Sequence, residues 1–138
     1  MDHISSVRLS FYLRNRFNTQ MESIVAFAGL DDKECLKKAF LDLSQVYLRA
    51  VSAFFDLSEI EHEERDEMLM SAVSDVLFMG ALLYRRLGEE QIVVKFEDHA
   101  LSCEIDIFCE IASFRVDSTY KSKEEVWNLD TFRRLLIN

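Results

Sequence analysis

Apolar residues recur at spacings of three and four along the first half of the chain, which is the period of a helix packed against a core. From Ile4 to Ala28 this spacing places Phe17, Met21 and Ile24 on one face. A longer stripe follows in the segment that ends at about Asp56, formed by Leu36, Phe40, Leu43, Tyr47, Ala50 and Phe54. Both segments are expected to form amphipathic helices.

A third helix is expected from about residue 59 to 87, because two apolar stripes run along it and make its second half apolar on much of its circumference. The stripes are Leu69-Val73-Val76-Gly80-Leu83-Leu87 and Met68-Ala72-Asp75-Met79-Leu82. This helix is expected to be the central one. Gly80 lies within one stripe, where the lack of a side chain allows a neighbouring element to approach closely.

The same period can be followed through the rest of the chain. A fourth helix is expected from about Gln91 to Phe114, with Ile92, Phe96, Cys103, Ile107, Ile111 and Phe114 on one face, and a fifth from Ser122, with Val126, Leu129, Phe132 and Leu136. The run Ile92 to Val94 could begin a strand, but the longer period favours a helix. The sequence therefore predicts an all-α fold, with residues 1–138 forming a single domain that is a bundle of about five helices.

Boundary signals support this division. The chain contains no proline and only three glycines, so the residues that tight turns between strands use most are scarce. Gly29 and Gly88 are expected to end the first and third helices. Three pairs have the spacing of a helix-starting capping box, namely Asp31 with Glu34, Ser58 with Glu61 and Ser122 with Glu125.

Composition places the protein among intracellular, cytoplasmic proteins. Its longest strongly apolar stretch, Val76 to Leu83, is much shorter than the roughly 20 residues that cross a bilayer. The three cysteines, Cys35, Cys103 and Cys109, form no CxxC pair and are expected as reduced thiols in helix cores. A net charge of −9 disfavours nucleic acid as a partner and favours a basic protein.

Two charged segments are candidate surfaces for contact with a partner protein. One is an acidic run with Glu59, Glu61, Glu63, Glu64, Asp66 and Glu67, and the other is a basic end with Arg8, Arg14 and Arg16. Each can also be read as a solvated helix face, and carboxylates suit the start of a helix. Glu59 and His62 have the Glu-x-x-His spacing of di-iron bundles, but the chain has no second copy of that motif.

Asp75 is the carboxylate with the most apolar helical neighbours. Ala72, Phe78 and Met79 lie three or four residues from it. A buried carboxylate needs a partner, and pairing with an arginine such as Arg49 is the simplest structural explanation.

The segment Ser71 to Gly88 resembles the third helix of MazG-type and dimeric-dUTPase-like pyrophosphohydrolases, and Lys38 to Val51 resembles the preceding helix of that family. The resemblance covers about residues 33–88. It implies an all-α fold in which carboxylates on facing helices bind Mg²⁺ and a nucleoside triphosphate. At the matching positions this chain retains Asp42, Gln45 and Asp75, whereas Leu41 and Ala72 replace acids, which implies a degenerate or vestigial pocket.

These observations lead to two functional expectations. The first is a non-catalytic, acidic interaction protein without a cofactor, acting as an adaptor or an antagonist of a basic partner, or as a homodimer. The second is a magnesium-dependent nucleoside triphosphate pyrophosphohydrolase working at Asp42, Gln45 and Asp75. No catalytic residue is assigned from the sequence, and neither a metal site nor the oligomeric state is fixed by it.

Overall fold

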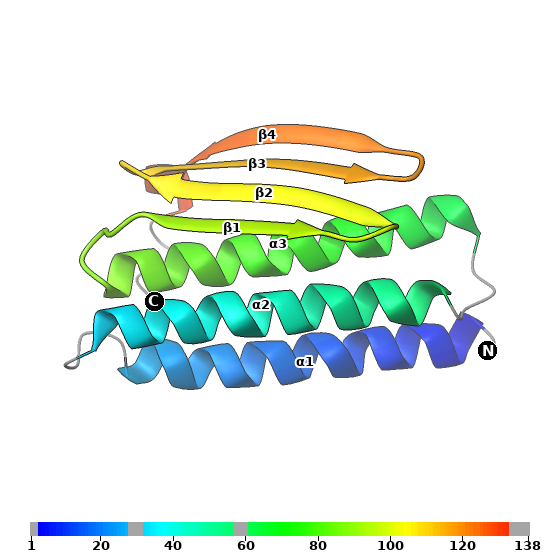
Figure 1. Cartoon of the computed structure of the whole chain (residues 1–138), viewed down its shortest axis with the longest axis horizontal. Helices are drawn as coiled ribbons and strands as arrows, with labels where there is room; N and C mark the ends of the chain where they lie inside the picture. The colour runs from blue at the N-terminus through cyan, green and yellow to red at the C-terminus, as the bar shows by residue number, and fades with distance from the viewer. Residues whose placement is uncertain (1–2, 28–31, 57–60, 133–138) are drawn as a thin grey trace.

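The computed structural model describes residues 3–27, 32–56 and 61–132, and within them three helices precede an antiparallel sheet of four strands. The helices are α1 (His3–Phe27), α2 (Lys33–Asp56) and α3 (His62–Arg86). The strands are β1 (Ile92–Glu97), β2 (Leu101–Phe108), β3 (Ile111–Ser118) and β4 (Ser122–Asn128), followed by a short 3-10 helix, η1 (Leu129–Phe132). Neighbours in sequence are neighbours in the sheet, which is therefore a simple meander (Figure 1).

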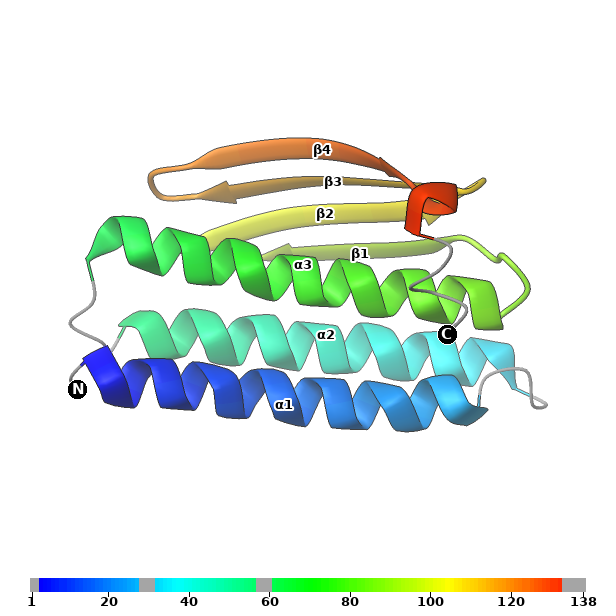
Figure 2. The same cartoon turned by 180° about the vertical axis from the view of Figure 1, so that it is seen from behind.

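The elements form layers. The inner face of the sheet rests on α2 and α3, and α1 packs against the same two helices on the side away from the sheet (Figures 1 and 2). The helices make their close contacts with β1, β2 and β3, so that β4 extends beyond the helical layer. The outer face of the sheet is not covered by any described element.

The expectation of an all-α bundle of about five helices is wrong. The segment predicted as a fourth helix, Gln91 to Phe114, contains β1, β2 and the first half of β3. The segment predicted to begin a fifth helix at Ser122 is β4, so the spacing of Ser122 and Glu125 is not a capping box. The fold is of the α+β class, with helices and strands segregated along the chain.

The prediction failed because apolar residues four apart satisfy both periods. In β2 the side chains of Leu101, Cys103, Ile105 and Ile107 are buried against the helices, and those between them point outward. In a strand every second residue faces the core, so alternate core residues are four positions apart in the sequence. Residues four positions apart also share one face of a helix. Ile111 shows the consequence: it is 47% exposed on the outer face of the sheet, not part of the core.

The turn between β2 and β3 uses no glycine. Cys109 and Glu110 have φ angles of 52° and 64°, in the left-handed region that non-glycine residues rarely adopt. The surrounding structure holds them there: the Glu110 N–H donates a hydrogen bond to the hydroxyl of Tyr84 (3.1 Å), and its carbonyl accepts one from the Leu129 N–H (2.9 Å). The Glu110 carboxylate also forms an ion pair with Arg85 (2.5 Å).

Helix α3 is the central element, in contact with α1, α2, β2 and β3. A Cβ atom at Gly80 would lie 2.9 Å from Ile107 Cδ1 and 3.1 Å from Phe40 Cζ, so this glycine allows the sheet and α2 to approach α3. The helix ends as predicted at Gly88, whose φ is 76°. By length and composition α3 could also span a membrane, but 56% of its most apolar window is buried within the fold, which is typical of a core helix.

The described start of α2 has a cap that was not predicted from the sequence. Asp32 starts α2, because its Oδ1 accepts a hydrogen bond from the Cys35 N–H (2.9 Å). Gly29, Asp31 and Ser58, which were predicted to mark helix boundaries, lie outside the described residues.

The three cysteines do not lie in helix cores as predicted. Cys35 on α2 and Cys109 in the β2–β3 turn are exposed, and Cys103 is buried in β2, where burial raises the pKa of its thiol to about 12.

Candidate interaction surfaces

Asp75 joins the three helices. Its carboxylate accepts a hydrogen bond from the Tyr47 hydroxyl of α2 (2.8 Å) and forms an ion pair with Arg14 of α1 (3.1 Å). The Tyr47 ring stacks on Phe17 of α1, with ring centroids 4.5 Å apart. The expectation that Asp75 pairs with an arginine is met by Arg14, and Arg49, the residue named from the sequence, is exposed on α2.

Burial dominates the electrostatics of this cluster. It raises the pKa of Asp75 above the ordinary aspartate value, even though the Tyr47 hydrogen bond and the Arg14 charge both lower it. The pKa of Tyr47 is raised for the same reason, with a further contribution from the negative charge of Asp75. The side chains of Asp75, Tyr47 and Arg14 therefore connect the three helices through a hydrogen bond and an ion pair, and each buried polar group has a partner.

A groove begins beside this cluster and runs along α3. Three adjoining hollows of 150, 380 and 510 Å³ compose it. We call it the α3 groove; its lining includes Arg14 and Asn18 of α1, Met70, Ser71, Ser74, Asp75 and Phe78 of α3, and Lys121, Lys123 and Trp127 beside or within β4. It is open, with both apolar and polar walls.

Asp42 and Gln45 do not lie in this groove. Asp42 is exposed, and Gln45 donates a hydrogen bond from Nε2 to the carbonyl oxygen of Lys95 on β1 (2.5 Å). Neither residue lines a hollow that contains Asp75. Among the described residues, no three His, Cys, Asp or Glu side chains are grouped so that they could hold a metal ion.

The outer face of the sheet carries an ordered arrangement of charges. Strand register places Lys95, Glu104, Arg115 and Glu124 in one row across the four strands, so that opposite charges alternate. Such cross-strand pairs stabilise a sheet by about 0.2–1 kcal/mol each. Three more carboxylates, Glu97, Asp106 and Asp117, lie in the adjoining rows and make this face acidic overall.

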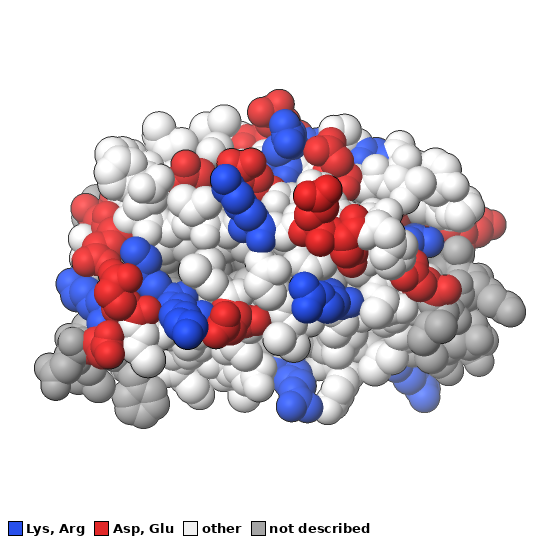
Figure 3. Space-filling view, in the orientation of Figure 1, with Lys and Arg blue, Asp and Glu red and all other residues white. Residues whose placement is uncertain are grey.

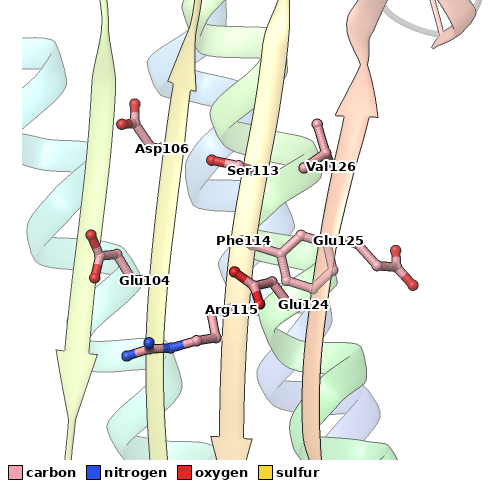
Figure 4. A pocket seen from close by; sticks show the side chains of 8 residues that line it. All are labelled: Glu104, Asp106, Ser113, Phe114, Arg115, Glu124, Glu125 and Val126. Carbon is pink, nitrogen blue, oxygen red and sulfur yellow. The ribbon is translucent and has the colours of Figure 1, made fainter.

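A shallow hollow of 290 Å³ opens on this face (Figure 4). Side chains from β2, β3 and β4 line it, and the Arg115 guanidinium extends over β2 toward Glu104 in the close-up. Glu125 points away from the other side chains, toward the free edge of β4.

Exposed apolar side chains gather at one end of the same face. Phe108 and Ile111 are directly opposite each other and are 49% and 47% exposed; Val93 and Val126 lie diagonal to them in the neighbouring row and are 37% and 68% exposed. We call these four residues the outer-face patch. They are four of the nine large apolar side chains that are exposed in the described part of the chain, so this end of the sheet is where such residues are most concentrated.

The acidic run predicted as a contact surface is not one continuous surface. Glu61, Glu63 and Glu67 are exposed, Glu64 is half-buried, and Asp66 is buried at 1% exposure. Glu59 lies outside the described residues. Asp66 therefore cannot contribute to a surface contact as the sequence suggested.

The basic end of α1 divides in a similar way. Arg8 and Arg16 are exposed, and Arg16 donates a hydrogen bond to the Tyr12 hydroxyl (3.3 Å). Arg14 is engaged with Asp75. Figure 3 shows basic side chains along the lower edge of the molecule, where α1 lies in Figure 1, whereas basic and acidic side chains are interspersed over the sheet above.

Sequence reasoning missed the outer-face patch, because it treated Phe108, Ile111 and Val126 as parts of helices. The signal that could have found it is the alternation from Leu101 to Phe108, in which Ser102, Glu104 and Asp106 separate buried residues. Comparison with protein-family models, with curated proteins and with solved structures finds no match for this chain.

Proposed function

We propose that this is a non-catalytic interaction protein that binds a basic protein through the outer face of its sheet. The observation that carries the proposal is the outer-face patch and its acidic surroundings. Exposed apolar side chains that are grouped and rimmed by polar residues are typical of protein-binding surfaces, whereas scattered ones are not.

The patch has the layout of such a surface. Phe108 and Ile111 offer apolar area at the end of the sheet, and Ser113 and Asp106 separate Val93 from Val126 in the next row. At protein interfaces a central cluster of side chains supplies most of the binding energy, and the rim around it excludes water. The rigid sheet holds these side chains in place before binding, which lowers the entropic cost of association.

Charge defines the expected partner. Glu104, Asp106 and Glu124 border the patch, and among the described residues of this face only Lys95 and Arg115 oppose the carboxylates. With a chain charge of −9, a partner surface rich in lysine and arginine would be steered toward this face.

The Asp75 cluster supports a non-catalytic function, because its side chains bind one another across three helices.

The test uses a photo-reactive amino acid at Ser113, between the two rows of the patch, in cells that produce the protein. Cross-linked proteins are identified and their affinity for the purified chain is then measured. We expect a basic partner whose binding weakens by about tenfold or more in the triple variant Phe108→Ser, Ile111→Ser, Val126→Ser, because apolar area at the centre of an interface supplies most of the binding energy.

Two matched controls accompany the test. Phe11→Ser, Tyr12→Ser, Val46→Ser removes exposed apolar residues from α1 and α2, and should leave affinity unchanged. For charge, Glu104→Lys, Asp106→Lys, Glu124→Lys should weaken binding, whereas Glu22→Lys, Glu34→Lys, Asp42→Lys changes the net charge equally on exposed helical positions. Equal losses from both triple reversals would indicate a non-specific charge effect and contradict the proposal.

A further inference from the structure

Among the described strands, β4 forms an edge of the sheet that no other described element covers. The β3–β4 turn closes with a hydrogen bond from the Ser118 N–H to the Lys121 carbonyl (2.7 Å). Antiparallel pairing alternates from that point, so the backbone groups of Ser122, Glu124 and Val126 face away from β3. Within the described chain, no residue takes up these groups, and they form a row that can pair with another strand.

The opposite edge is different. The backbone groups of Val93, Lys95 and Glu97 face away from β2, but the carbonyl of Lys95, at the middle of this edge, accepts the hydrogen bond from Gln45. Helix α2 also lies alongside β1. An added strand at β1 would have to displace this side chain, whereas β4 presents no such obstacle among the described residues.

The α3 groove lies beneath the open edge. Its two larger hollows, of 510 and 380 Å³, extend from Lys121 and Lys123 at one end of β4 to Trp127 at the other, and share Ser71 and Ser74 of α3. Because residues of α3 and of β4 line these hollows together, a strand placed beside β4 would lie over the groove. Alternate side chains of such a strand would point into the groove.

We propose that β4 and the α3 groove bind an extended segment of a partner protein, which adds a fifth strand to the sheet. Main-chain hydrogen bonds to Ser122, Glu124 and Val126 supply affinity, and the groove selects the side chains that enter it. This site uses the backbone of Val126, whereas the outer-face patch uses its side chain, and the proposal does not rest on the function proposed above.

The groove also defines the chemistry of that segment. At one end Phe78, which is 37% exposed, and the half-buried Trp127 offer an apolar contact. At the other end Lys121 and Lys123 are exposed, and Lys121 forms no ion pair with a described residue. The segment therefore carries an apolar side chain for the Trp127 end and an acidic one for the Lys121 end.

A second copy of this chain fits the edge less well. When two β4 strands pair antiparallel over their whole length, Glu125 of each lies directly opposite the same residue of the other copy. Like charges placed opposite each other destabilise a sheet. The charged run Lys123 to Glu125 is also the kind of sequence that discourages edge-to-edge self-association.

The experiment uses a random peptide library displayed on phage and selected on the purified, immobilised full-length chain. Enriched peptides are expected to share an apolar and an acidic position in an extended pattern. Bound peptide should protect the amides of Ser122, Glu124 and Val126 from hydrogen exchange. The variant Val126→Pro, which removes one outward N–H while leaving the bonds to β3 intact, should weaken binding by about tenfold.

The matched control is Val93→Pro, the same change at an outward-facing position of β1, which should leave peptide affinity unchanged. A second variant, Ser74→Trp, fills the α3 groove without altering β4 and should also abolish binding, so the proposal does not depend on a proline being tolerated. Failure to enrich any peptide, or enriched peptides that bind Val126→Pro and Ser74→Trp normally, would overturn the proposal. A dimer in sedimentation that Val126→Pro dissociates would overturn it in favour of a second copy.

Discussion

Asp75 illustrates how a single side chain can link the helices of this fold. It accepts from Tyr47 of α2 and pairs with Arg14 of α1, so that one carboxylate of α3 contacts both other helices. Burial nevertheless makes its charged form unfavourable, as the raised pKa indicates. The cluster therefore specifies how the helices are aligned at some cost in stability at neutral pH.

Asp75→Asn should make the protein less sensitive to pH. A raised pKa means that the folded state binds more protons than the unfolded state, so this residue's contribution to stability falls as pH rises above the ordinary aspartate pKa of about 4. Relative to the wild type, the variant should gain unfolding free energy as pH rises from about 4, and the difference should become constant above the raised pKa of Asp75 in the folded state. Urea unfolding at several pH values measures the difference.

The comparison with Asp42→Asn isolates the effect, because Asp42 is exposed on α2 and away from the cluster. That variant should follow the wild type across the same pH range. A difference between wild type and Asp75→Asn that stays constant with pH would mean that burial does not control this carboxylate.

At the scale of elements, the hairpin of β2 and β3 shows how tertiary contacts impose an unfavourable turn. Cys109 and Glu110 both adopt positive φ, which costs about 1–2 kcal/mol for an ordinary L-residue. Glu110 is compensated by its contacts with Tyr84, Arg85 and Leu129. Cys109 is exposed at the tip of the turn.

Cys109→Asn should stabilise the protein by about 1 kcal/mol, because asparagine adopts the left-handed region at lower cost than cysteine. Chemical denaturation under reducing conditions measures the change. Glu110→Gly is the informative counterpart: it relieves the same kind of strain but removes the ion pair with Arg85, and should not stabilise. Stabilisation by both substitutions would show that the Arg85 contact contributes little.

This hairpin also explains how far the sequence could predict the fold. The helical stripes of α1, α2 and α3 were recognisable because each extends over many turns, and Gly88 marked a real helix end. The strands were hidden because their turns lack the usual residues: Cys109 and Glu110 occupy positions where Asn-Gly is common. The need of Asp75 for a partner could be inferred locally, but choosing Arg14 over Arg49 required the packing of α1 against α3.

At the scale of the whole molecule, the layers differ in how firmly they are held. Helix α3 is in contact with both the sheet and the other helices, whereas α1 makes its close contacts with α2 and α3. Among the described side chains of α1, Phe17 and Met21 are the fully buried ones. Buried apolar contact is what gives an element its local stability.

Native-state hydrogen exchange should therefore show α1 opening before the rest of the fold. The opening free energy measured from the α1 amides is expected to be at least about 1–2 kcal/mol lower than that measured from the α3 amides. The reason is that separation of α1 leaves the contact between α3 and the sheet intact. Equal opening free energies in α1 and α3 would mean that the three helices unfold together.

The hydrogen bond from Gln45 to Lys95 has a consequence for how this protein can assemble. Fibrils grow when every subunit offers two free sides, one to join the chain before it and one to receive the next. Here the Gln45 side chain already binds the Lys95 carbonyl at the β1 edge, so among the described strands β4 is the edge at which a strand can be added without displacing such a contact. Any such assembly should end as a discrete pair of fixed composition and should not propagate into a polymer.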